Sequence, residues 1–94
     1  RKGTTMKLDL KFRGIVVKNK DDSVVPDDQW IVFLAKDNAV PAMLHTYKEQ
    51  CIALGAKEAQ ILGISELILR VERWRQAHPE LCKVPDVSPG ELTG

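Results

Sequence analysis

The stretch that decides the fold is residues 57–74, KEAQILGISELILRVERW, because its apolar residues fall on two sides of one helix. At 3.6 residues per turn, six of them share one face: Ile61, Ile64, Leu67, Ile68, Val71 and Trp74. Leu62 and Leu69 fall on the other side, seven residues apart and therefore stacked two turns from each other. Two leucines stacked on a polar face predict a partner for that face.

A second interpretation divides the same residues into two short helices broken at Gly63. A small residue at Ala59, the glycine at the turn and a polar residue at Ser65 then resemble the helix-turn-helix family. The resemblance covers residues 57–74 only. It implies a small DNA-binding regulator whose second helix presents three side chains to the duplex: Ser65, Arg70 and Arg73.

The charge balance argues against DNA binding, although it does not decide whether the helix is broken at Gly63. The chain carries a net charge of only +1 with acidic and basic residues mixed, whereas DNA-binding domains concentrate basic residues on one face. Glu66 would also meet phosphate groups in the helix-turn-helix arrangement. A glycine inside a helix costs only about 1 kcal/mol relative to alanine, so Gly63 is compatible with one unbroken helix.

The main functional prediction is therefore a small non-catalytic protein–protein interaction module, whose partner is a second copy in a homo-oligomer or another protein. In this hypothesis the second helix buries its stacked leucines against the partner, while an acidic and a basic residue set the orientation. The predicted interface consists of Leu62, Glu66, Leu69, Arg73 and Trp74.

Hydropathy patterns elsewhere predict an α+β fold, with a small antiparallel sheet of two or three N-terminal strands followed by a helical hairpin packed on one face. Alternation over residues 7–13, β-branched residues at 15–17 and 24–25, and the apolar run 29–35 indicate strands. An apolar stripe from Val40 predicts the first helix, which Gly55 ends. That stripe comprises Val40, Met43, Leu44, Tyr47, Cys51 and Leu54. Residues 1–80 are expected to form one domain, and residues 81–94 an extended or disordered tail.

The sequence offers little chemistry for catalysis. It contains no phosphate-binding glycine loop and no nucleophile motif, so we expect no enzyme and no cofactor. His45 and Glu49 are read as an exposed pair on one helix face and not as a metal site. Cys51 and Cys82 lie in no pair motif, and no segment is apolar enough to span a membrane. These features together predict a cytoplasmic protein.

Overall fold

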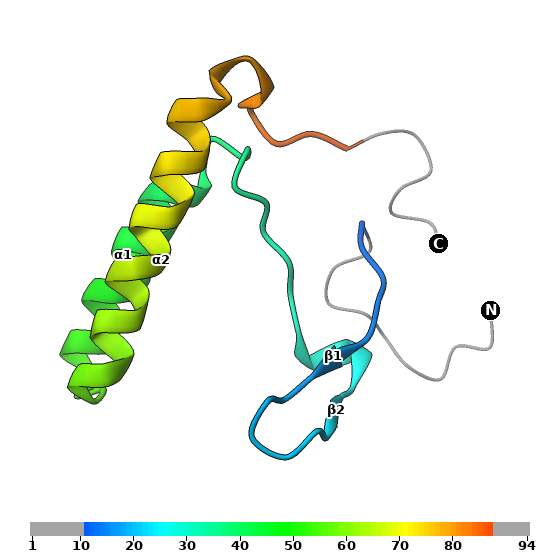
Figure 1. The fold of residues 1–94 in the computed structure, drawn as a ribbon, viewed down its shortest axis with the longest axis vertical. Helices are drawn as coiled ribbons and strands as arrows, with labels where there is room; N and C mark the ends of the chain where they lie inside the picture. Colours follow the sequence, from blue (N-terminus) through cyan, green and yellow to red (C-terminus); the bar gives the residue numbers. More distant parts are fainter. Residues whose placement is uncertain (1–10, 88–94) are drawn as a thin grey trace. The chain divides into compact units, whose positions relative to one another are not determined.

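The computed structural model describes residues 11–87, which belong to two compact units (Figure 1). One unit contains residues 11–32 with residues 86–87, and the other is Phe33–Pro85. A two-stranded antiparallel sheet in the first unit is followed by two packed helices in the second. The predicted α+β class with a helical hairpin is thus confirmed. The division into a domain of residues 1–80 and a tail of residues 81–94 stays a prediction.

The sheet pairs β1 (Val16–Val17) with β2 (Val24–Val25). The turn between the strands is closed by local hydrogen bonds: the carboxylate of Asp21 accepts from the hydroxyl and the backbone N–H of Ser23, at 2.7 and 3.0 Å. The hydroxyl bond, followed by the backbone bond, holds the pKa of Asp21 below its usual value. Asp22 completes the turn in the left-handed region at φ 61°.

The strand predicted over residues 29–35 is wrong. A short 3-10 helix, η1 (Asp27–Gln29), precedes it, and residues 30–34 have no regular secondary structure. A strand requires a ladder partner, and in the described part of the chain only β1 and β2 pair as strands. The apolar run over residues 29–35 therefore indicated a hydrophobic segment, but it did not indicate whether a neighbouring strand is present to pair with it. Of the strand predicted over residues 7–13, residues 7–10 lie outside the described range and residues 11–13 are not in a strand.

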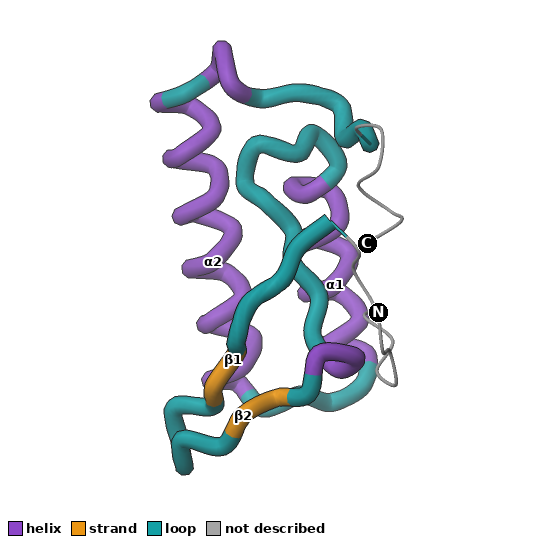
Figure 2. The backbone as a smooth tube through the Cα atoms, turned by 90° about the vertical axis from the view of Figure 1, so that its right-hand side faces the viewer, coloured by secondary structure: helices purple, strands orange, loops and turns teal. Residues whose placement is uncertain are grey.

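The two helices, α1 (Val40–Ala53) and α2 (Glu58–Ala77), lie side by side and are joined by a tight turn (Figure 2). Gly55 adopts φ +81°, its N–H donates to the carbonyl of Ile52, and the next N–H reaches the carbonyl of Cys51. This pair of bonds is the Schellman arrangement, which satisfies the last carbonyls of a helix and favours glycine. The predicted end of the first helix at Gly55 is therefore confirmed.

The second helix is unbroken at Gly63. α2 spans 20 residues with continuous helical structure, and it ends before His78 and Pro79. A helix-turn-helix needs a change of direction at Gly63, so that interpretation of residues 57–74 is wrong. A Cβ added at Gly63 would meet nothing within 4 Å, so no close contact requires a glycine there.

The core of the helical unit lies between the two helices. It consists of five buried residues: Val40 and Leu44 from α1, with Ile64, Ile68 and Val71 from α2. The predicted apolar face of the second helix is confirmed, because its remaining members are half-buried and Leu67 packs against this core. The predicted stripe of the first helix is wrong at Tyr47 and Leu54, which are exposed. One packed helix covers only a narrow stripe of its neighbour.

No helix within residues 11–87 is long and apolar enough to cross a membrane.

Candidate functional site

The outer stripe of α2 is the strongest candidate site. We define it as Leu62, Glu66, Leu69 and Arg73, which follow one another at steps of four, three and four residues. Such steps place side chains along one line of a helix. All four are exposed; Leu62 retains 60 % and Leu69 48 % of its accessible surface. This line faces away from the buried residues of the same helix, so the structure brings these four predicted interface residues together.

The charges of the outer stripe have no partner within residues 11–87. Neither Glu66 nor Arg73 takes part in an ion pair or a side-chain hydrogen bond in this part of the chain. Arg70 stands four residues after Glu66, at the spacing at which opposite charges on a helix pair, yet no bridge forms between them. The two charges are therefore available to a partner.

Trp74 does not lie on the outer stripe, although the sequence grouped it with that surface. It stands five residues beyond Leu69, which corresponds to a rotation of about 140° around the helix. The indole stacks on the imidazole of His78, with ring centroids 4.5 Å apart and planes inclined by 26°. Trp74 instead lines an apolar groove.

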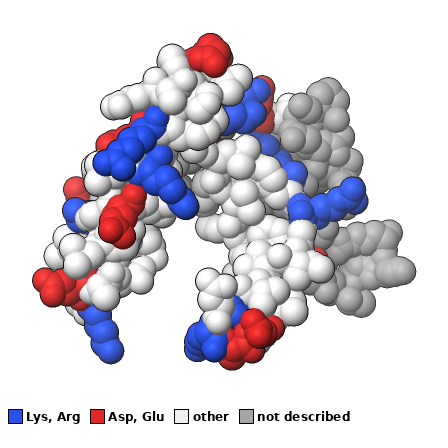
Figure 3. Space-filling view, in the orientation of Figure 1, with Lys and Arg blue, Asp and Glu red and all other residues white. Residues whose placement is uncertain are grey.

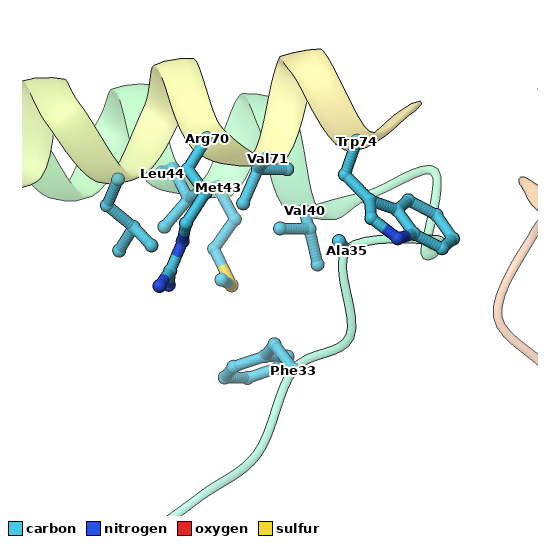
Figure 4. Close-up of a pocket in the computed structure, with 9 residues that line it drawn as sticks. Phe33, Ala35, Val40, Met43, Leu44, Arg70, Val71 and Trp74 are labelled. Carbon is cyan, nitrogen blue, oxygen red and sulfur yellow. The ribbon is translucent and has the colours of Figure 1, made fainter. Parts of the chain in front are cut away.

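The groove lies between the two helices and the segment before α1, and its volume is about 430 Å³ (Figure 4). Arg70 is the only charged side chain among its lining residues. The figure shows Arg70 and Met43 extending from their helices toward the side where Phe33 lies. The lining consists of Phe33, Ala35, Val40, Met43, Leu44, Leu67, Arg70, Val71 and Trp74. Sequence reasoning missed this groove because the run containing Phe33 was assigned to a strand.

The three residues proposed for DNA contact do not share one face. The hydroxyl of half-buried Ser65 donates to the carbonyl of Ile61 at 3.2 Å, within its own helix. Arg70 lines the groove and Arg73 belongs to the outer stripe. The space-filling view shows acidic and basic side chains interspersed over the helices (Figure 3). This face therefore lacks the concentrated basic surface that a duplex requires.

A second feature that the sequence did not reveal is a clasp centred on Arg75. Its guanidinium donates from Nη1 to the carbonyls of Ala35 and Asp37, at 3.0 and 3.1 Å, and from Nη2 to Oδ1 of Asn38, at 2.9 Å. These bonds fix the end of α2 against the segment that enters α1. The partners lie about 40 residues away in sequence, so no local pattern could have indicated them.

The polar residues of the first helix also pair differently from the prediction. Nε2 of His45 lies 3.5 Å from a carboxylate oxygen of Glu72 on α2, and not against Glu49 as predicted. The His45 side chain is exposed and that of Glu72 is partly exposed. Within residues 11–87, no group of three or more His, Cys, Asp or Glu side chains is arranged to hold a metal ion.

Comparisons with protein-family models, with curated proteins and with solved structures returned no match. The feature that needs explanation is a single helix that buries one face and presents a second, partly apolar stripe.

Proposed function

We propose that this protein is a non-catalytic interaction module that self-associates through the outer stripe of α2. The observation that carries the proposal is the exposure of Leu62 and Leu69 in one line with two unpaired charges, opposite a face that is already buried. In such a stripe the charged residues keep the exposed leucines compatible with water in the free chain, and they make the contact specific when the stripe is paired.

Self-association is energetically favoured because the helical unit alone buries few of its apolar side chains. Its core holds only five buried side chains, and none of them is fully enclosed. Full burial of a leucine side chain is worth about 1.5–3 kcal/mol. In a two-fold pair each copy contributes the same surface, so Leu62 and Leu69 are covered in both copies. Self-association thereby adds burial that the two helices cannot supply alone.

The test is the solution mass of the full chain, measured by light scattering over a concentration series. The wild-type chain should form a dimer as concentration rises, and the double substitution Leu62→Gln with Leu69→Gln should return it to a monomer. Leu54→Gln is the matched control: Leu54 is 82 % exposed but caps α1 and does not belong to the outer stripe. This control should keep the wild-type mass.

Two results would contradict the proposal. One is a wild-type chain that stays monomeric at every concentration, which means that the leucines are tolerated as free surface. The other is a dimer whose mass is unaffected by the double substitution, which places the contact elsewhere on the chain. Circular dichroism of each variant should show unchanged helix content, because both leucines are exposed.

A further inference from the structure

We infer that the two copies pack with their α2 helices antiparallel, about a two-fold axis that passes between residues 69 and 70. The inference rests on the proposed function, because it specifies the geometry of the self-associated pair. It follows from the order of chemistry along the outer stripe, which runs apolar, acidic, apolar, basic: Leu62, Glu66, Leu69 and Arg73.

The axis position is set by matching residues that lie equally far from it on opposite sides. In an antiparallel pair such residues meet at the same level. Glu66 then lies level with Arg73 of the second copy, and Leu62 lies level with Ala77 of the second copy, the exposed last residue of the helix. Leu69 meets Leu69 of the second copy, offset by about 1.5 Å, the rise of one residue.

This arrangement satisfies each charge on the outer stripe. Two Glu66–Arg73 pairs, one on each side of the axis, flank a central contact between the two Leu69 side chains. A central apolar contact with a polar rim is the usual anatomy of a protein interface. Both charges are unpaired among the described residues of the single chain, so pairing breaks no existing ion pair.

A parallel arrangement of the two α2 helices does not place opposite charges against one another. With two helices parallel and in register, Glu66 faces Glu66 and Arg73 faces Arg73, so both polar positions oppose like charges. Juxtaposed like charges are unfavourable and suppress that association. Charge complementarity therefore selects the antiparallel orientation, with a second copy of this chain as the partner.

The orientation is tested by disulfide cross-linking of the full chain in a Cys51→Ala, Cys82→Ser background. A disulfide forms only when two Cβ atoms approach within about 3.5–4.5 Å. Leu69→Cys should cross-link to itself on mild oxidation, because it lies beside the axis. Glu66→Cys and Arg73→Cys should each remain uncross-linked when oxidised separately. A mixture of the two single variants should form a disulfide between residue 66 of one copy and residue 73 of the other. Self-linking of Glu66→Cys would overturn the antiparallel register.

Charge exchange supplies the second test. Glu66→Arg or Arg73→Glu alone should weaken dimerisation by about tenfold or more, because each places like charges opposite one another. The double variant carrying both substitutions should recover the wild-type dissociation constant to within a few fold. A double variant as weak as the single ones would overturn the assigned pairing.

Light scattering of the wild-type chain and of the cysteine-free background distinguishes loss of self-association from loss of this register alone. If that background is monomeric while the wild-type chain dimerises, a background of Cys51→Ser with Cys82→Ala replaces it. A wild-type chain that is monomeric throughout removes the proposed function itself. A dimer that lacks the Leu69→Cys cross-link keeps the proposed function and removes only this register.

Discussion

The two faces of α2 carry similar side chains but have opposite surroundings. Ile68 and Leu69 are adjacent aliphatic residues of similar size, yet Ile68 is 6 % exposed and Leu69 is 48 % exposed. The difference arises from α1, which covers the first residue and not the second. The apolar residues of a helix thus indicate all the faces that can be buried. The fold of the single chain determines which face is buried by the chain itself and which stays exposed until a partner binds.

The largest expected effect comes from shortening these neighbours in turn. Ile68→Ala should lower the free energy of unfolding by about 2–5 kcal/mol, because it leaves a cavity in a core of five residues. Leu69→Ala should cost much less in the monomer and should instead weaken dimerisation. Urea denaturation at low protein concentration measures the first effect, and light scattering measures the second. Equal losses of monomer stability would show that Leu69 is also covered within the chain.

A second comparison is between two arginines of α2: Arg75, which forms the clasp, and Arg73, which lies on the exposed outer stripe. Arg75→Met should destabilise the chain by about 1–3 kcal/mol, because it leaves the half-buried carbonyls of Ala35 and Asp37 without their donor. Arg73→Met, two residues earlier on the outer stripe, should change monomer stability by less than about 0.5 kcal/mol. Thermal unfolding of both variants at low concentration makes the comparison, and similar melting temperatures would argue that the Arg75 bonds are dispensable.

The smallest expected effect concerns the two glycines of the helical hairpin. Gly63→Ala should stabilise the chain by up to about 1 kcal/mol, since alanine is the better helix former and the added Cβ meets open space. Gly55→Ala should destabilise it by about 1 kcal/mol, because φ +81° is unfavourable for alanine. Chemical denaturation should therefore give opposite signs. A loss of stability for Gly63→Ala would revive a turn at that residue.

Periodicity predicted the helical unit well because its signals are local. The end of the first helix follows from the glycine at position 55, while the buried residues of α2 and the exposure of Leu62 and Leu69 follow from spacing along one helix. The strand over residues 29–35 failed because strand formation depends on a partner distant in sequence. The groove, the Arg75 clasp and the pairing of His45 with Glu72 depend likewise on distant segments, which a single sequence does not place.

The segment before α1 and the segment after α2 are direct neighbours in space. The N–H of Asn38 donates to the carbonyl of Lys83 at 2.9 Å, and the N–H of Lys83 donates to the carbonyl of Lys36 at 3.0 Å. Within the helical unit, residues 36–38 and Lys83 therefore lie side by side, next to the two ends of the helical hairpin. Units with adjacent ends tolerate transplantation into a loop of another protein and circular permutation. We therefore expect that residues 36–83 can be inserted into a loop of a host protein without forcing the two sides of the insertion site apart.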